Sequence, residues 1–434
     1  GIMCTDHPDT LVAVRKDCPL LIGLGKGENY IASDIPALLE YTRDYYLLET
    51  NEIAVLKNDG VKLYGIDGKE IKKEVYHVTW DIAAAEKGGY DYFMMKEIME
   101  QPEALKKTIQ PRVTESGIHL EDVSLTEEEI KNCGRIHIVA CGSAMHAGVV
   151  GIYVIEETCR IPVEVDIASE FRYRNPILAK NDLCIIISQS GETADTLAAL
   201  REAKKQGVKV LAIVNVVGSS IARESDDVIY TWAGPEIAVA TTKGYTTQVS
   251  VLYLIALYFA RVRGTMTEEA YTAAVKELHD LPEKTAEVLK VDARMAEIAK
   301  KYANCENAFI IGRGLDYAVA MESSLKLKEI SYIHSEAYAA GELKHGTISL
   351  IEDGTLVVAI ATQESLLEKT VSNVKEVKAR GAKVLAIATE DCTAIEDVAD
   401  EVVYLPKVNH LFTASYDVLP MQLFAYYIAV ERGC

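Results

Sequence analysis

The sequence lacks the signatures of several classes of protein. Its nine cysteines include no Cys-x-x-Cys pair, so neither a zinc ribbon nor a thioredoxin-type site is indicated. We expect reduced thiols, as in a cytoplasmic protein. The longest apolar run, residues 249–260, is too short to span a membrane and predicts a buried helix. No charged-then-apolar leader is present, and we expect the chain, which starts at Gly1, to be a piece of a longer protein.

Positive charge is also scarce. The 45 Lys and Arg residues stand against 65 Asp and Glu residues, which gives a net charge of −20. Nucleic acids and anionic membranes are bound through clustered Lys and Arg, so we expect neither as a partner. A small anion can still bind at a local site. The 434 residues, 49% of them apolar, predict a globular protein of about three domains.

The first 80 residues predict a layered sheet. Short apolar or alternating runs at residues 11–14, 20–24 and 53–57 are typical of strands. Asn58-Asp59-Gly60 and Asp67-Gly68 are turn signals between such runs. We therefore expect part of a meander or of a sheet-on-sheet structure here.

A linker and then an α/β pattern follow. Residues 92–110 predict two helices that separate at Pro102. Ser124 or Thr126 is expected to cap the next helix. From about residue 130, apolar runs with the length of buried parallel strands alternate with helical segments. These runs are residues 136–140, 183–187 and 208–214.

An internal repeat divides this α/β region in two. Residues 207–213 recur 174 positions later as residues 381–387, and residues 138–142 match residues 310–314 at an offset of 172. A collinear match across a whole domain predicts two doubly wound parallel-sheet domains of similar topology. Their connection is predicted to be helical, at residues 267–279 and 285–302.

A phosphate site is predicted in the first repeat. The run 183–187 leads into Ser188-Gln189-Ser190-Gly191-Glu192-Thr193 and then into a helix. Hydroxyl donors, a glycine that lets the backbone approach and a helix N-terminus together favour an anion. A plain helix N-cap is the alternative, but three hydroxyls and a glycine exceed what capping needs.

A second small-residue loop, Cys141-Gly142-Ser143-Ala144, also leads into a helix. We expect Gly142 and Ser143 to line the same anion site. A buried thiol is the better interpretation of Cys141 than a nucleophile, because no base lies nearby. In the second repeat, residues 362–365 would correspond to residues 188–191. Glu364 in place of Ser190 would then repel a phosphate, so we expect only the first repeat to keep the phosphate site.

The second repeat carries groups suited to proton transfer. Glu322, Lys326 and Glu329 lie at i, i+4 and i+7 on one face of a predicted helix, although a solvated charged face is the alternative. His345 follows in the Gly-rich loop 339–346. A carboxylate, an amine and an imidazole near a phosphate site predict aldose–ketose chemistry. A base moves a proton between C1 and C2, and an acid–base group opens the sugar ring.

Three motifs, at residues 188–193, 322–338 and 340–346, resemble those of the isomerising glutamine–fructose-6-phosphate aminotransferases, also called glucosamine-6-phosphate synthases. The resemblance extends over the whole chain. It implies an α/β fold with two tandem sugar isomerase (SIS) domains, preceded by the C-terminal part of an α+β N-terminal-nucleophile glutaminase domain. The implied bounds are 1–80 for the glutaminase part, 81–125 for a helical linker, 126–267 for the first SIS domain, 268–298 for a helical connection and 299–434 for the second SIS domain.

The resemblance also implies the roles of residues. Glu329 would move the proton between C1 and C2, assisted by Lys326 and Glu322. His345 would open the fructose ring and would reach across a homodimer interface into the neighbouring subunit's site. Asp34 would hold the α-amino group of glutamine. The residues expected to line the sugar-phosphate site are Ser143, Ala144, Ser188, Gln189, Ser190, Thr193, Val239 and Thr241.

Three positions depart from the family pattern. The family's glutaminase nucleophile is a Cys at the mature N-terminus, whereas Cys4 is internal and has no free amine to act as its base. The sequence stops at Cys434, before the tail lysine that forms a Schiff base with the open sugar. Ala144 stands where the family commonly has a phosphate-binding serine. We therefore expect a truncated or partly ordered piece of the enzyme.

The implied function is the formation of glucosamine 6-phosphate, a precursor of UDP-N-acetylglucosamine, from fructose 6-phosphate and glutamine-derived ammonia. No metal, nucleotide or flavin cofactor is required. Two alternatives remain open. Another tandem SIS protein, a phosphosugar deglycase or deaminase, would lack the glutaminase part. A sugar-phosphate-sensing module would need the phosphate site but not the base.

Overall fold

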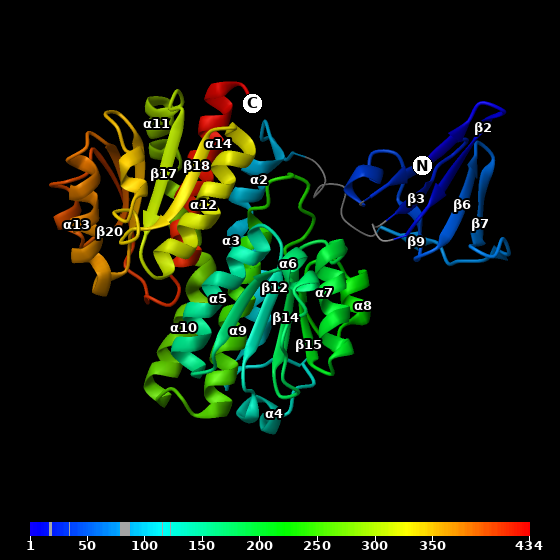
Figure 1. Cartoon of the computed structure of the whole chain (residues 1–434), viewed down its shortest axis with the longest axis horizontal. Coiled ribbons are helices and arrows are strands. Elements are labelled where there is room, and N and C mark those ends of the chain that lie inside the picture. The colour runs from blue at the N-terminus through cyan, green and yellow to red at the C-terminus, as the bar shows by residue number, and fades with distance from the viewer. Residues whose placement is uncertain (17–19, 34, 79–86, 115, 122) are drawn as a thin grey trace.

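The computed structural model describes residues 1–16, 20–33, 35–78, 87–114, 116–121 and 123–434. These residues form an N-terminal lobe and two parallel-sheet domains (Figure 1). The lobe lies to one side, and the second parallel-sheet domain packs above the first. The fold class predicted from the sequence is confirmed.

The N-terminal lobe contains two antiparallel sheets. Their strand orders are β1-β2-β6-β7-β8 and β4-β3-β5-β9. Alternating side chains such as Ala13, Ile22, Leu48 and Ala54 form the small core between them. The three strand runs predicted from the sequence lie in β2, β3 and β6. The strands are β1 (Ile2–Cys4), β2 (His7–Val14), β3 (Leu21–Leu24), β4 (Asn29–Ala32), β5 (Asp44–Leu47), β6 (Glu52–Lys57), β7 (Gly60–Gly65), β8 (Glu70–Ile71) and β9 (Tyr76–His77), with a 3-10 turn η1 (Pro36–Leu38).

The linker forms the two predicted helices, which separate beside Pro102 in the first turn of the second. Thr126, rather than Ser124, caps the following helix through a reciprocal capping box with Glu129. The elements are α2 (Phe93–Met99), α3 (Gln101–Ile109), η2 (Gln110–Arg112), β10 (Val113–Thr114), β11 (Gly117–Ile118) and α4 (Glu127–Asn132).

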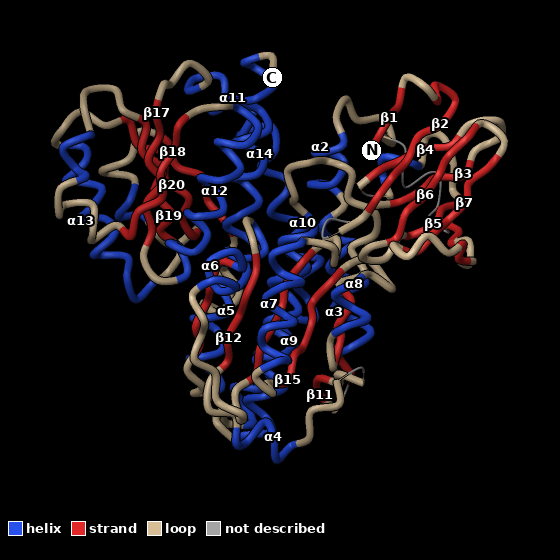
Figure 2. The backbone as a smooth tube through the Cα atoms, turned by 45° about the vertical axis from the view of Figure 1, so that its right-hand side comes forward, coloured by secondary structure: helices blue, strands red, loops and turns tan. Residues whose placement is uncertain are grey.

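The first parallel-sheet domain has the strand order β13-β12-β14-β15-β16. Its central strands are fully buried, which explains their continuous apolar runs. Figure 2 shows helices on both sides of the sheet. The elements are β12 (Ile136–Ala140), α5 (Ser143–Cys159), β13 (Val163–Ile167), α6 (Ala168–Tyr173), β14 (Leu183–Ser188), α7 (Ala194–Lys205), β15 (Lys209–Val214), α8 (Ser220–Glu224), β16 (Asp227–Tyr230) and α9 (Lys243–Arg263).

The second parallel-sheet domain repeats this topology in the order β18-β17-β19-β20-β21. The predicted internal repeat is therefore a repeat of structure. The elements are β17 (Asn307–Gly312), α12 (Leu315–Ser331), β18 (His334–Ala339), η4 (Thr347–Leu350), β19 (Leu356–Ala361), η5 (Glu364–Leu366), α13 (Leu367–Lys378), β20 (Lys383–Thr389), η6 (Thr393–Ile395), β21 (Glu401–Leu405) and α14 (Ala414–Arg432).

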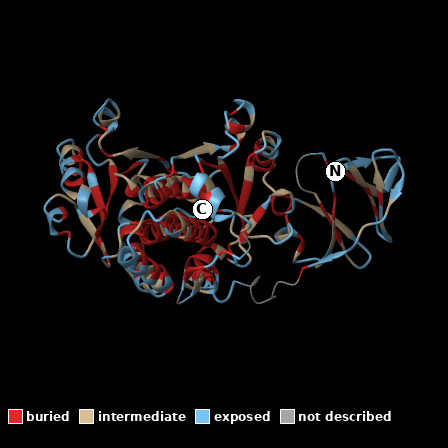
Figure 3. Ribbon diagram, turned by 90° about the horizontal axis from the view of Figure 1, so that it is seen from below, coloured by how far each residue is buried: buried red, intermediate tan, exposed pale blue. Residues whose placement is uncertain are grey.

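One hydrophobic core joins the two parallel-sheet domains. Helix α5 packs against α9 and α12, and α12 packs against α14. In Figure 3 the helices between the two sheets are mostly buried, whereas the N-terminal lobe is largely exposed. Because α12 belongs to the second domain and α5 to the first, this packing brings side chains of the two repeats together.

The connection between the two parallel-sheet domains is helical, as predicted from residues 267–279 and 285–302. Its first helix, α10 (Glu268–Val288), continues through Pro282, and η3 (Leu289–Val291) separates it from α11 (Asp292–Tyr302). The loop with His345 does not follow the charged helix directly, since strand β18 lies between them.

Candidate active site

A cavity of about 230 Å³ opens at the carboxyl ends of β12 and β14. The strand order changes direction between these two neighbours, which is where open parallel sheets bind ligands. All eight residues predicted to contact the sugar phosphate line this cavity. The lining residues are Cys141, Ser143, Ala144, Ile187, Ser188, Gln189, Ser190, Thr193, Thr196, Glu236, Ala238, Val239, Thr241 and Gln248.

The loop between β14 and α7 is ordered by its own hydroxyls. Ser188 Oγ accepts a hydrogen bond from the Gly191 N–H at 3.1 Å and lies 3.1 Å from Thr193 Oγ1. Ser190 Oγ accepts from the Glu192 N–H at 3.2 Å. Gly191 has a φ of +66°, and a Cβ atom there would lie 2.0 Å from Ser219 Oγ. Only glycine fits this turn, which brings three hydroxyls to the N-terminus of α7.

The charged face of α12 reaches the cavity through Ser143. The Ser143 hydroxyl donates to Glu322 Oε1 at 2.8 Å, and His146 Nδ1 lies 2.8 Å from Glu322 Oε2. Lys326 Nζ lies 3.6 Å from Glu322 and 2.7 Å from Glu329 Oε2. The alternative of a solvated charged face does not hold, since the side chains of Glu322 and Lys326 are 0% and 1% exposed.

Glu329 is the most accessible of these three groups, with 29% of its side chain exposed. A partly exposed carboxylate can meet a substrate. Glu322, Lys326 and Glu329 are not among the residues that line the cavity. Ser143 is the residue that belongs to both groups.

Two predicted site residues lie elsewhere. His345 is exposed in the turn after β18, where its N–H donates to the Glu342 carbonyl at 2.9 Å. It is not part of the cavity lining in its own subunit. Asp34, the predicted glutamine-binding residue, lies outside the described residues.

Sequence reasoning missed Gln248 as a cavity residue. It lies in the first turns of α9, is buried, and its Oε1 atom has no hydrogen-bond partner among the described residues. An unpartnered buried amide costs about 1–3 kcal/mol unless a ligand or water satisfies it. The sequence feature that could have indicated this role is a glutamine near the start of a helix whose other residues are almost all apolar or small. Cys141, by contrast, is a half-buried wall residue 3.6 Å from Thr196 Oγ1.

The second domain differs at the corresponding place. Strand pairing aligns Leu183 with Leu356, because each pairs with the first residue of the next strand, Lys209 or Lys383. The offset between these strands is therefore 173, not 174. Gln363, and not Glu364, corresponds to Ser190, so that part of the prediction was wrong by one position. Glu364 is an exposed residue that pairs with Lys407 at 2.9 Å.

A carboxylate of the chain itself occupies this place in the second domain. Asp316 Oδ2 accepts from the N–H groups of Thr362 and Gln363 at 3.0 and 3.4 Å. The Thr362 hydroxyl lies 2.7 Å from both Asp316 and Asp417. Burial raises the pKa of Asp316 to about 6, and burial with the charge of Asp316 raises the pKa of Asp417 well above its usual value. The two buried carboxyl groups therefore hold a proton in the acid range.

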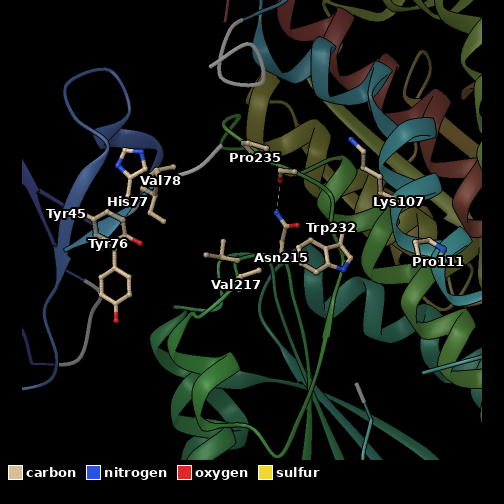
Figure 4. Close-up of a pocket in the computed structure, with 13 residues that line it drawn as sticks. Tyr45, Tyr76, His77, Val78, Lys107, Pro111, Asn215, Val217, Trp232 and Pro235 are labelled. Atoms are coloured by element: carbon tan, nitrogen blue, oxygen red, sulfur yellow. Dashed lines mark hydrogen bonds between the residues drawn. The ribbon is translucent and has the colours of Figure 1, made fainter. Parts of the chain in front are cut away.

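Two further features bear on partners. A larger cavity of about 710 Å³ lies between the N-terminal lobe and the first domain, with Tyr45, His77 and Trp232 in its wall (Figure 4). It contains none of the predicted substrate residues.

Across the described parts of the chain, no helix is long and apolar enough to cross a membrane, and no cluster of His, Cys, Asp or Glu could hold a metal ion. The eight cysteines within these parts are free.

The sequence model of the SIS domain family matches residues 129–258 and 301–432, so the chain is a tandem SIS protein. Over 435 aligned residues it is 57% identical to the glutamine–fructose-6-phosphate aminotransferase (isomerizing) of Clostridium tetani, covering 100% of this chain and 72% of that relative. The C-terminal domain of glucosamine-fructose-6-phosphate aminotransferase from Francisella tularensis is 39% identical with a TM-score of 0.76, covering 80% of this chain and 98% of that one.

The chain therefore belongs to the family of isomerising glutamine–fructose-6-phosphate aminotransferases, as the resemblance of its motifs predicted. Glucosamine-6-phosphate deaminase from Thermotoga maritima is also similar, at 24% identity and a TM-score of 0.63, over 79% of this chain and 95% of that one. That likeness shows the shared fold alone.

Proposed function

We propose that this protein forms glucosamine 6-phosphate from fructose 6-phosphate and glutamine-derived ammonia. The observation that carries the proposal is the connection between the two repeats at Ser143. This residue lines a hydroxyl-rich cavity and donates to the buried end of the Glu322–Lys326–Glu329 row. A phosphate-binding cavity and a positioned base are the two parts that an aldose–ketose conversion requires.

The roles of the residues follow from this arrangement. The hydroxyls of Ser188, Ser190 and Thr193 and the N-termini of α5 and α7 would hold the phosphate. Ammonia condenses with the C2 carbonyl and water leaves. Glu329 would then take a proton from C1 and return it to C2, which leaves an aldehyde at C1 and an amine at C2. Lys326 would hold Glu329 in position through their contact at 2.7 Å, and Glu322 would hold Lys326 and Ser143 in place.

We also propose the source of the ammonia, the assembly and the location of the protein. Residues 1–80 would be the C-terminal part of the glutaminase, and a cavity of about 640 Å³ between the lobe, Ser190 and Val239 supports ammonia delivery from that side. The exposed turn with His345 supports a homodimer in which this imidazole opens the ring in the neighbouring subunit's cavity. The free thiols support a cytoplasmic location.

Substitutions in the two parts test this proposal. Ser190→Glu should lower the affinity for fructose 6-phosphate at least about 100-fold by calorimetric titration, because a carboxylate would face the phosphate. Thr272→Glu adds the same charge on an exposed face of α10 and should leave the affinity unchanged. Equal affinity of wild type and Ser190→Glu would refute the phosphate assignment.

The second substitution separates an enzyme from a sensor. Glu329→Gln should keep the affinity for fructose 6-phosphate while turnover falls by about 10²–10⁴, since only the transfer of the proton is lost. A sugar-phosphate-sensing module would be indifferent to this change. A deaminase is disfavoured by the 57% identity, which extends through the N-terminal lobe.

A further inference from the structure

One wall of the cavity is a segment without helix or strand. Residues 235–242, here called the strap, are the later part of the connection from β16 to α9. Glu236, Ala238, Val239 and Thr241 of the strap line the cavity. A segment without helix or strand has no regular backbone hydrogen bonds, so its N–H groups need other acceptors. The positions of those acceptors determine the conformation of the segment.

Helix α2 of the linker supplies acceptors within the strap and contacts the residue just after it. Glu97 Oε1 accepts from the N–H groups of Ile237 and Ala238 at 2.6 and 3.1 Å. Glu100, the C-cap residue of α2, pairs with Lys243 at 2.7 Å, just beyond the strap. A single short helix thus holds the strap at two points that are six residues apart.

The strap also holds itself. Glu236 accepts from Thr241 Oγ1 at 2.7 Å and from the N–H groups of Thr242 and Gly244 at 2.8 and 3.0 Å, which caps α9. At its start, Asn215 donates to the Gly234 carbonyl at 2.7 Å (Figure 4). These contacts fix the ends of the strap, whereas Glu97 fixes Ile237 and Ala238 beside the cavity.

Glu97 is an unusual residue for a linker helix. It is 2% exposed, and its Oε2 atom is buried without a hydrogen-bond partner among the described residues. Burial and the charge of Glu236 raise its pKa to about 7, although the two strap N–H groups and Lys243 oppose the shift. Burying a carboxyl group here costs stability that an apolar side chain would not cost. The two hydrogen bonds that Glu97 accepts from the strap offset part of this cost.

We propose that Glu97 is a positioning residue of the sugar-phosphate cavity, which sets the strap at the distance that the bound sugar requires. This rests on the proposed function of the cavity. Glu97 does not line the cavity, so it acts through Ala238 and Val239. It also makes the linker helix part of the sugar site, so that the position of α2 determines the position of the wall.

The experiment compares three variants of the purified protein by titration with fructose 6-phosphate and by amide hydrogen exchange. Glu97→Ala should raise the Kd about 10-fold or more and speed exchange at Ile237 and Ala238. Glu97→Gln keeps an oxygen that can accept both N–H groups, so its Kd should stay within about 3-fold of wild type. Glu103→Ala, which removes an exposed carboxylate on α3, should change neither measurement.

The outcomes separate the inference from a merely structural role. Loss of affinity in Glu97→Ala with rescue in Glu97→Gln supports the inference, whereas wild-type affinity and exchange in a folded Glu97→Ala overturn it. If Glu97→Ala does not fold, Glu97→Asp, whose carboxylate is one methylene shorter, should give the same pattern more weakly. If wild type binds no fructose 6-phosphate, the proposed function fails. Amide exchange at Ile237 and Ala238 then still decides whether Glu97 holds the strap.

Discussion

In both parallel-sheet domains a glycine leads from the first strand into the first helix with nearly the same backbone. Gly142 has φ and ψ of 58° and −133°, and Gly314 has 59° and −128°. Two residues further on, the first domain has Ala144 and the second has Asp316. Ala144 lines an open cavity, whereas the carboxylate of Asp316 takes the N–H groups beyond β19.

This difference shows that the fold alone does not make an anion site. The strand ends and helix N-terminus of a doubly wound sheet attract negative charge in either domain. In the second domain the negative charge comes from the Asp316 side chain of the protein itself. Through Thr362, Asp316 also links α12 to the end of β19 and to α14. The same helix carries Glu322, Lys326 and Glu329. In the proposed function, the first repeat would hold the substrate and the second would supply the base.

The strongest test of this comparison moves the internal carboxylate into the first domain. Ala144→Asp should lower the affinity for fructose 6-phosphate by about 1,000-fold. Two unit charges about 4 Å apart repel by about 4 kcal/mol at an effective dielectric constant of about 20. Calorimetric titration at constant salt measures the change, because salt screens such repulsion.

Ala144→Ser is the matched control for that substitution. It adds a hydroxyl donor of similar size in place of a charge, and we expect unchanged or higher affinity. An Ala144→Asp protein that binds fructose 6-phosphate as wild type does would show that the anion is held elsewhere, and the comparison of the two domains would lose its basis.

A smaller effect should follow from Asp316 itself. Its folded pKa of about 6 is higher than the ordinary value of 3.8, so the native state binds more protons than the unfolded chain between about pH 4 and pH 6. The free energy of unfolding should therefore fall as pH rises through this window. A shift of about two pKa units corresponds to about 3 kcal/mol. Urea denaturation from pH 4 to pH 8 should show this loss in wild type and a smaller loss in Asp316→Asn, because Asp417 and Glu97 also have raised pKa values.

Asp397→Asn serves as the control for this measurement, because it removes an exposed carboxylate from the same domain. Its stability should keep the pH dependence of wild type. If Asp316→Asn shows the full wild-type loss, Asp316 does not hold a proton in the native state at acid pH.

The sequence predicted the duplicated sheets, the hydroxyl-rich loop and the charged face of α12, since each follows from a local pattern. It could not give the strand register. A buried parallel strand is a continuous apolar run, and a shift by one residue leaves that run apolar. The prediction for Glu364 failed for this reason, because only the pairing of Leu356 with Lys383 reveals the offset of 173.

Contacts between distant residues were also beyond the sequence. The sequence analysis assigned no role to Asp316, whose partners Thr362 and Asp417 lie 46 and 101 positions further along the chain. Glu97 looked like part of a polar linker, although its partners are 140 and 141 residues away. Burial of such groups depends on how α2, α12 and α14 pack, which no local pattern specifies.

The smallest expected effect concerns Gln248, which lines the cavity of the first domain with an unpartnered Oε1 atom. Gln248→Met keeps the volume of the side chain and removes the amide. We expect about a 10-fold loss of affinity for fructose 6-phosphate, which is the effect of one hydrogen bond, together with unchanged or higher thermal stability. The two effects, lower affinity and unchanged or higher stability, distinguish a ligand contact from a packing role. Substitution of a residue that only fills the core would lower the stability of the protein and leave the affinity unchanged. A Gln248→Met protein with lower stability and wild-type affinity would remove Gln248 from the sugar site, leaving the hydroxyls of the β14–α7 loop as the polar contacts that distinguish the first domain from the second.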